Sequence, residues 1–244
     1  MSQLDLACEA GISTRHLSFV ETGRAAPSRD MLLHLAEQLE VPVRERNVLL
    51  VAAGYAPLFP ERSLEDPQLA AARAAIDKVL ESHKPYPAFA VDRHWNMVAS
   101  NNAMPSIYDG VAPDLMRPPV NVLRLALHPQ GMAPRTANLA EWRAHLLARL
   151  RQQIDLTADQ VLMDLHAELI AYPAPRAAPT HAGANRIPGV LTPFQLRVGD
   201  AVLSFFSTTM VFGTPIDVTL SELAIESFFP ADAETAAAVR EMGE

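Results

Sequence analysis

The segment GISTRHLSFVETGR, residues 11–24, combines a glycine turn with a short amphipathic helix. Gly11 is suited to close a preceding helix in the left-handed conformation, and Ser13 is a good N-cap for the helix that follows. Leu17 and Val20 lie three residues apart, so they share one face of that helix. The polar side chains between them point away from this face. The segment therefore predicts an apolar underside and a polar helix tip.

The residues before this segment predict another short helix. Ser2 followed by Asp5 has the spacing of a capping box. The pattern is then a helix over residues 2–10, a turn over 11–13 and a helix over 14–22. In a helix-turn-helix, the second helix enters the major groove of DNA and its first residues meet base edges. Two short helices around a glycine also occur in ordinary small bundles, so the spacing alone leaves a purely structural role open.

Two further helices are predicted in APSRDMLLHLAEQLEVPVRERNVLLVAAGYAP. Ser28 caps the first, Pro42 stands at a first-turn position of the second, and Gly54 ends it. The apolar side chains expected to line these two helices are Leu32, Leu35, Ala36 and Leu39 in the first, and Val48, Leu49 and Ala52 in the second.

The stretch SQLDLACEAGISTRHLSFVETGRAAPS, followed by LAEQLEVP, resembles the lambda-repressor-like helix-turn-helix of Xre-family regulators over roughly residues 2–57. The resemblance implies binding to double-stranded operator DNA. Arg15 at the helix tip would pair with guanine, and Gln3 would meet a phosphate. In register with the family's base-contacting positions, the expected DNA-facing residues are Gln3, Ser13, Thr14, Arg15, His16, Ser18 and Arg24.

Domains of this kind have five helices, and this sequence begins at the cap of the second. An absent first helix would expose part of the core that is expected from Ala7, Leu17, Leu35 and Leu49. At roughly 25 cal/mol per Å², that exposure would cost several kcal/mol. Three explanations of the missing helix are open: the start of the chain was assigned too late, the truncation is natural, or a partner surface fills the gap. DNA binding by the chain as written therefore stays open at this stage.

The charge distribution argues against strong binding by a single copy. The chain has a net charge of −8, and residues 1–62 hold six Arg and eight Asp or Glu, a balance of −2. Attraction to phosphates needs a basic surface, which Arg15, Arg24 and Arg29 would supply only locally. We therefore expect a homodimer on two half-sites. No long apolar run, no signal peptide and a single cysteine predict a cytoplasmic protein without a membrane span.

Pro57 and Pro60 mark a boundary, and the expected organisation is residues 1–60, a connecting helix in 61–84, and residues 85–244. Asp66 caps the connecting helix, whose apolar stripe would dock on its own chain or form a dimer contact. Beyond it, PAFAVDRHWNMVASN and FQLRVGDAVLSFFSTTMVFG each predict a hairpin, and ELAIESFFP one more strand. Helices are predicted in NLAEWRAHLLARLRQQI, TADQVLMDLHAELIAY and DAETAAAVREM. In the TADQVLMDLHAELIAY helix, the side chains expected to point inward are Val161, Leu162, Leu165 and Leu169.

This order predicts an α+β fold, with an all-α helix-turn-helix domain followed by an antiparallel sheet and helices. The second part resembles a PAS-like sheet with a helical insertion. The stretches PAFAVDRHWNMVASN, NVLRLALHP, NLAEWRAHLLARL and LSFFSTTMVFGTPIDVTLSELAIESFFPAD resemble the MmyB-like ligand-binding domain over about residues 65–240. One departure is Ser100, where that family usually has a second tryptophan. The resemblance implies a DNA-binding transcription regulator that senses an apolar small molecule, with fatty acids as one class.

The pocket of such a domain would lie between the sheet and the helix over 138–152, with the five-proline loop over 173–193 as a lid or binding segment. Arg124, His128, Arg143 and His145 could each serve a carboxylate head. Each of these residues could equally be an ordinary surface residue, and each apolar candidate an ordinary core residue. The expected ligand-binding residues are Phe89, Val91, Trp95, Met97, Trp142, Arg143, Leu146, Leu150, Phe205 and Met210.

Other function classes find less support in the sequence. No His-x-x-x-His or Cys-x-x-Cys spacing occurs, and no glycine-rich phosphate loop. His166 and Glu168 lie two residues apart and do not share a helix face, while the STT at 207–209 falls in a predicted strand. We expect no metal or cofactor, and an enzyme is the least supported class. A dimerisation or protein-interaction scaffold without a ligand or DNA-binding activity remains the alternative.

Overall fold

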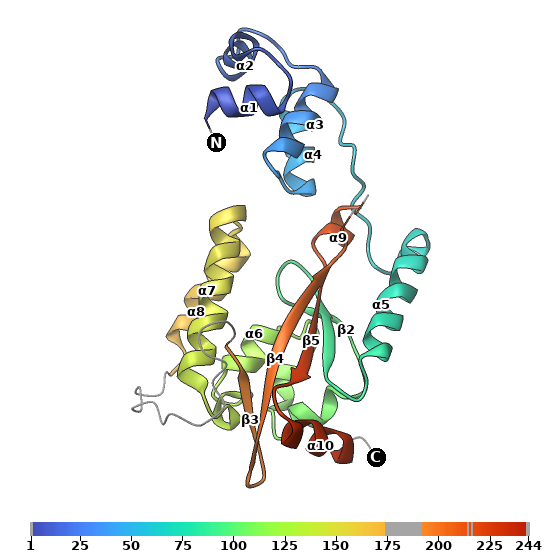
Figure 1. Ribbon diagram of the computed structural model, residues 1–244, viewed down its shortest axis with the longest axis vertical. Coiled ribbons are helices and arrows are strands. Elements are labelled where there is room, and N and C mark those ends of the chain that lie inside the picture. The colour runs from blue at the N-terminus through green and yellow to red at the C-terminus, as the bar shows by residue number, and fades with distance from the viewer. Residues whose placement is uncertain (1, 174–191, 214, 216, 243–244) are drawn as a thin grey trace. The chain divides into compact units, whose positions relative to one another are not determined.

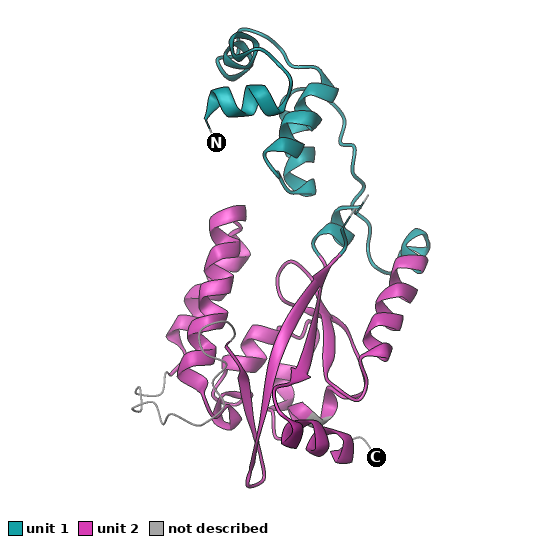
Figure 2. Ribbon diagram, in the orientation of Figure 1, with its two compact units in different colours: residues 1–70, 212–222 teal, residues 71–211, 223–244 magenta. Residues whose placement is uncertain are grey.

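The structure is a computed structural model that describes residues 2–173, 192–213, 215 and 217–242. Contacts divide it into two units, residues 1–70 with 212–222 and residues 71–211 with 223–244 (Figure 2). The first unit is helical, and the second combines an antiparallel sheet with helices (Figure 1). The predicted α+β class is therefore confirmed. Most of the proline-containing segment that was expected as a loop, from 174 to 191, lies outside the described residues.

Serine caps begin the first helices of the chain, as predicted. Ser2, Ser13 and Ser28 each accept a hydrogen bond from the backbone N–H three residues on. The small core of this unit is built from Leu6, Ala7, Ala10, Leu17 and Leu35. The helices themselves are α1 (Gln3–Glu9), α2 (Thr14–Glu21), α3 (Arg29–Gln38) and α4 (Val43–Ala52).

The buried face of α4 differs from the prediction. Val48 and Leu49 were expected to line the core, but their exposed fractions are 62% and 40%. Leu50 is fully buried instead, and Ala52 is exposed. Residues 48–52 are apolar without interruption, so spacing alone could not select the face that finds a packing partner. Leu39 was likewise expected to line its helix and is 48% exposed at the C-terminal end of α3.

The first unit also contains residues 212–222, with α9 (Val218–Ser221), although they follow the second unit's β4 in sequence. Arg44 of α4 donates from Nε to Oε1 of Glu222 at 2.7 Å and from Nη1 to Oε2 of Glu61 at 2.9 Å. Hydrogen bonds to Glu222 first, and to Glu61, raise the pKa of Arg44. The guanidinium therefore stays charged and joins two segments that are distant in sequence.

Asp217 makes a second connection inside this unit. Its carboxylate lies 3.0 Å from Nη1 of Arg62 and also accepts the backbone N–H of Thr219 at 2.9 Å, which caps α9. The Thr219 hydroxyl in turn donates to the Arg62 carbonyl at 2.6 Å. Since the side chain of Asp217 is 1% exposed, its charge is balanced by these partners rather than by water.

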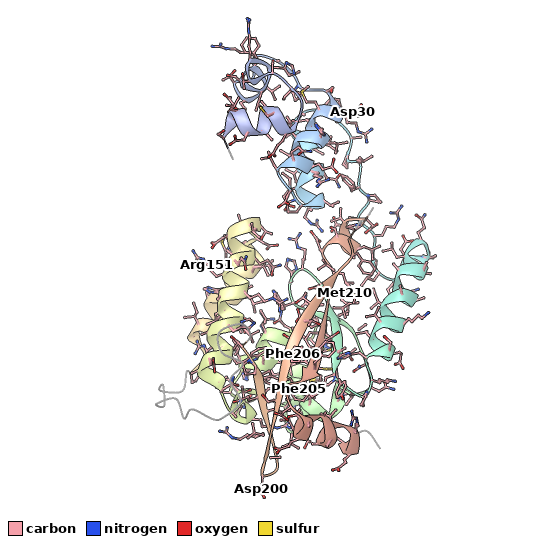
Figure 3. The ribbon with its side chains drawn as sticks, in the orientation of Figure 1. Asp30, Arg151, Asp200, Phe205, Phe206 and Met210 are labelled. Atoms are coloured by element: carbon pink, nitrogen blue, oxygen red, sulfur yellow. The ribbon has the colours of Figure 1, made fainter. Side chains whose placement is uncertain are left out.

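The described part of the second unit forms a five-stranded antiparallel sheet in the order β2-β1-β5-β4-β3. Gly199, with a φ of +56°, makes the predicted turn between the last two strands of that order, and Asp200 marks its tip in Figure 3. The strand β1 is buried along its whole length, so both of its faces are covered. The strands are β1 (Ala88–Val91), β2 (Met97–Ser100), β3 (Phe194–Val198), β4 (Ala201–Val211) and β5 (Ala224–Pro230).

Helices pack around this sheet. The helices α7 and α8 lie side by side, and α10 packs against β4 and β5 (Figure 1). Asp66 begins the connecting helix, as predicted, through a short 3-10 turn at Pro67–Leu69. Val161, expected to point inward, is 53% exposed in the first turn of α8. The helices are α5 (Ala70–Ser82), α6 (Val122–Leu127), α7 (Leu139–Thr157), α8 (Gln160–Ala171) and α10 (Ala233–Met242).

A buried asparagine joins the connecting helix to the sheet. The side chain of Asn101 donates to the carbonyls of Leu80 and Tyr86 at 3.1 and 2.8 Å, and its carbonyl accepts the N–H of Ala88 at 3.2 Å. Asn101 is 2% exposed. These backbone groups have little access to water, so the amide of Asn101 is a required partner.

We predict that Asn101→Ala lowers the free energy of unfolding by about 2–4 kcal/mol, because it removes hydrogen bonds and leaves buried backbone groups unpaired. Urea denaturation followed by circular dichroism measures this loss. The neighbouring Asn102 is exposed, so Asn102→Ala is the matched control and should change stability by less than about 0.5 kcal/mol. Equal losses for the two variants would contradict the assignment.

Candidate DNA-binding surface and ligand pocket

The residues expected to face DNA surround the N-terminal end of α2. Ser13 Oγ accepts the N–H of His16 at 3.1 Å, which fixes the first turn of the helix. The guanidinium carbon of Arg15 lies 5.3 Å from the ring centre of Phe19, within the range of a cation–π contact. His16 and Ser18 are partly buried. The exposed members of the set are Gln3, Ser13, Thr14, Arg15 and Arg24.

A pocket opens in the second unit between the sheet and the helices α6 and α7. Its cavity volume is about 60 Å³, well below the roughly 300–1,000 Å³ of most small-molecule sites. Methionine side chains adapt readily to a changed shape, and Met104 and Met132 lie in the wall. The apolar lining comes from Pro87, Phe89, Trp95, Met104, Ile107, Tyr108, Val122, Leu123, Leu125, Ala126, Met132, Trp142, Leu146, Phe194 and Phe228.

The structure brings only part of the expected ligand-binding set into this lining, namely Phe89, Trp95, Trp142 and Leu146. Others belong to the adjoining core: Val91, Leu150 and Phe205 are buried there, and Met97 packs against it. Met210 is 51% exposed near the end of β4 (Figure 3). Arg143 donates to the carbonyls at the C-terminal end of α8 and caps that helix instead.

The other side chains that were expected to bind the carboxylate of a ligand also lie outside the pocket lining. Arg124 forms an ion pair with Glu168 at 2.8 Å. His128 contacts Tyr172 edge-on, with 5.0 Å between ring centres. His145 stacks on Trp142 at 5.3 Å, and burial first, then the charge of Arg149, lowers the pKa of its imidazole.

The polar residues that do line the pocket were not expected from the sequence: Arg149, Ser207 and Glu226. Arg149 donates from Nη2 to Oε1 of Glu226 at 2.5 Å and to Oγ1 of Thr209 at 2.8 Å. Thr209 in turn donates to Oε1 of Glu226 at 2.9 Å. We call Arg149, Thr209 and Glu226 the polar corner. The lone acidic residue inside the apolar strand AIESFFP was the available sequence signal.

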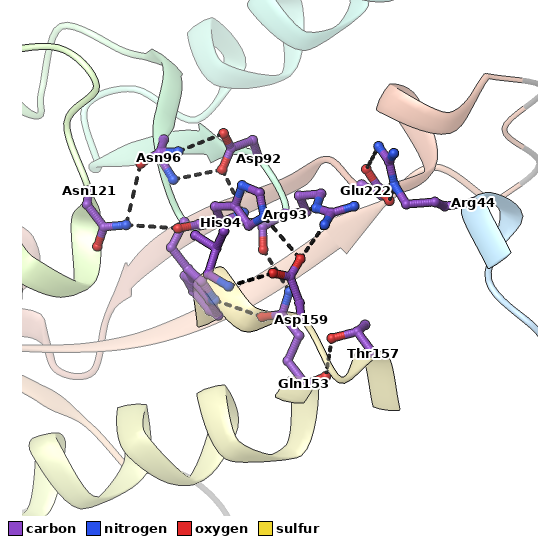
Figure 4. Close-up of polar contacts among 12 residues, drawn as sticks. Arg44, Asp92, Arg93, His94, Asn96, Asn121, Gln153, Thr157, Asp159 and Glu222 are labelled. Atoms are coloured by element: carbon purple, nitrogen blue, oxygen red, sulfur yellow. Dashed lines mark hydrogen bonds and ion pairs between the residues drawn. The ribbon is translucent and has the colours of Figure 1, made fainter. Parts of the chain in front are cut away.

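The turn between β1 and β2 positions Trp95 beside this corner. Trp95 has a φ of +66°, which is rare for a bulky residue. The Asp92 carboxylate accepts the N–H of both His94 and Asn96 at 2.8 Å, and this holds the turn (Figure 4). As a result, the guanidinium carbon of Arg149 lies 4.7 Å from the Trp95 ring centre.

The same turn is tied to the helices of the insertion. Gln153 of α7 accepts the indole N–H of Trp95 at 2.8 Å and donates to the Arg93 carbonyl at 2.8 Å. Asp159, which caps α8, forms an ion pair with Arg93 and lies 3.1 Å from Nε2 of His94 (Figure 4). Burial raises the pKa of Asp159, but the hydrogen bonds and positive charge around it outweigh burial and lower the pKa overall.

Comparison with known families identifies the chain. The family described as the MmyB-like transcription regulator ligand binding domain matches residues 72–242, which is well over half of the sequence. The chain belongs to this family. A helix-turn-helix family matches residues 1–46. No curated protein was found to match the sequence.

The two matches together make the MmyB-like chain a ligand-responsive, DNA-binding transcription regulator, because they pair a DNA-binding module with a ligand-binding one. Neither family is an enzyme family. Within the described residues, no cluster of His, Cys, Asp and Glu is arranged to hold a metal ion. In the same part of the chain, every helix is too short or too polar to cross a membrane.

Proposed function

We propose that this regulator binds operator DNA through the N-terminal end of α2 and that an apolar small molecule in the pocket changes its affinity for that operator. The observation that supports the ligand is the largely apolar pocket between the sheet and α6 and α7. A fatty acid is the ligand class implied by the family resemblance. The second unit then works as a PAS-like sensor, with a sheet face and covering helices around one site.

The small cavity has a consequence for this mechanism. A long hydrocarbon chain needs more than about 60 Å³, so binding must separate the helices from the sheet or move side chains of the wall. The ligand-bound and ligand-free states therefore differ in packing. A ligand shifts a two-state equilibrium only through its different affinity for the two states, and the need for expansion supplies that difference.

On the DNA side, we predict that Arg15→Ala weakens binding to the chain's own promoter by about 1–3 kcal/mol, because a bidentate contact to guanine would be lost. Fluorescence anisotropy at fixed salt measures the affinity. Arg117→Ala removes the same charge from a side chain that is 79% exposed in the second unit, and it should leave binding unchanged. A loss below about 1 kcal/mol for Arg15→Ala would count against a base contact.

On the ligand side, we predict that native mass spectrometry of the freshly purified protein detects a bound small molecule, and that fatty acids raise its melting temperature and alter operator affinity. The chain has two tryptophans, Trp95 and Trp142, and both line the pocket. Tryptophan fluorescence, excited selectively, therefore reports on pocket occupancy.

Leu146→Gln, in the pocket wall, should abolish the ligand's effects on fluorescence and melting temperature. Leu156→Gln, on the same helix but 74% exposed, is the matched control and should retain them. If nothing co-purifies and no apolar ligand, fatty acids included, changes melting temperature or operator affinity, the sensor proposal fails. The second unit would then be better described as a dimerisation scaffold.

We further propose that the protein acts in the cytoplasm as a homodimer, with α5 or the exposed apolar side chains of the first unit in the interface. The balance of −2 over residues 1–62 supports this, since it makes a single half-site contact weak. Exposed Val48 and Val51 would supply apolar contact area. Light scattering at micromolar concentration should give twice the chain mass, and a mass of one chain would refute the dimer.

A further inference from the structure

The pocket has an apolar side and a polar end on the same sheet. In the β4–β5 ladder, Thr209 pairs with Glu226, and Ser207 pairs with Phe228. Side chains two residues apart on a strand share a face, so Glu226 and Phe228 point the same way, and both line the pocket. One such step along a strand is about 7 Å. A chain lying against Phe228 therefore brings its end group to the polar corner.

The polar corner contains one positive and one negative charge. Arg149 and Glu226 are in direct contact at 2.5 Å, and Thr209 bonds to both. The side chain of Glu226 is 4% exposed and that of Arg149 is 28% exposed. The pair is therefore already neutral as a whole before any ligand enters.

A charged head group would disturb this balance. A carboxylate that approached Arg149 would also approach the buried carboxylate of Glu226, and repulsion between like charges is strong where water is excluded. An ammonium would meet Arg149 in the same way. His145 offers little attraction for a carboxylate, because burial first and the charge of Arg149 second lower the pKa of its imidazole.

We propose that the pocket selects an uncharged amphiphile, an apolar chain that ends in a hydroxyl or primary amide, over the carboxylate of the same chain length. A hydroxyl or amide both donates and accepts, so it can donate to Glu226 and accept from Arg149 without breaking their ion pair. This inference rests on the proposed ligand-binding function and narrows its ligand class. Arg149 and Glu226 become the residues that determine head-group specificity.

The test compares four ligands of one chain length on the full-length protein: 1-dodecanol, dodecanamide, dodecanoate and dodecylamine. Each is titrated below its solubility limit or, for the two charged ligands, below its critical micelle concentration, with tryptophan fluorescence as the readout. The alcohol and the amide should bind at least about tenfold more tightly than dodecanoate, a difference of about 1.4 kcal/mol. Tighter binding of dodecanoate would overturn the inference while leaving the proposed function intact. Binding of none of the four would overturn both.

Glu226→Gln sharpens the test, because glutamine keeps the shape and hydrogen bonds of the side chain and leaves Arg149 without its counter-charge. Dodecanoate should then become the tightest of the four ligands. Glu141→Gln changes the same charge at an exposed site in the first turn of α7 and should preserve the wild-type order. An unchanged order in a folded Glu226→Gln protein would overturn the role of the pair. If that variant does not fold, the wild-type order alone decides.

Discussion

The Asp92 carboxylate sets the conformation on which the pocket depends. By accepting the N–H groups of His94 and Asn96, it closes a turn in which Trp95 takes a left-handed backbone conformation. Backbone bonds then run from Met97 to the Val120 carbonyl and from Val122 to the Trp95 carbonyl, so the turn also fixes where α6 begins. Gln153 adds α7 to the same assembly. The pocket wall at Trp95, the positions of α6 and α7 and the polar corner therefore all depend on this one turn.

Local chemistry explains what the sequence could predict of the fold. A serine that caps a helix acts through atoms at most three residues away, and for this reason the starts of α1, α2 and α3 were correct. The turn at Gly199 was equally local. The buried face of α4 was wrong because Val48, Leu49 and Leu50 are all apolar, and the choice among them depends on tertiary packing.

The site was harder to predict, for a related reason. Phe89, Trp142 and Leu146 could be assigned to the pocket region because each stands on the apolar side of a recognisable element, and Trp95 because it is a large apolar residue of the predicted hairpin. The contact of Arg149 with Glu226 joins residues 77 positions apart and depends on how α7 packs on the sheet, while the register of β4 against β5 sets Thr209 opposite Glu226. Arg143 shows the opposite error, a residue that was expected in the pocket and is not there. Its position on α7 suggested a ligand contact, but its guanidinium donates to carbonyls at the C-terminal end of α8.

Residues 212–222 limit how the chain can be divided. They connect β4 to β5, yet Asp217 and Glu222 pair with Arg62 and Arg44 inside the first unit. A fragment that ended at residue 70 would lack both carboxylates. A fragment that began at residue 71 would carry them, together with Val218, which is 1% exposed in the intact chain, without the surroundings that bury them. A segment of the first unit therefore lies within the sequence of the second, and no single cut of the chain separates the two units into complete pieces.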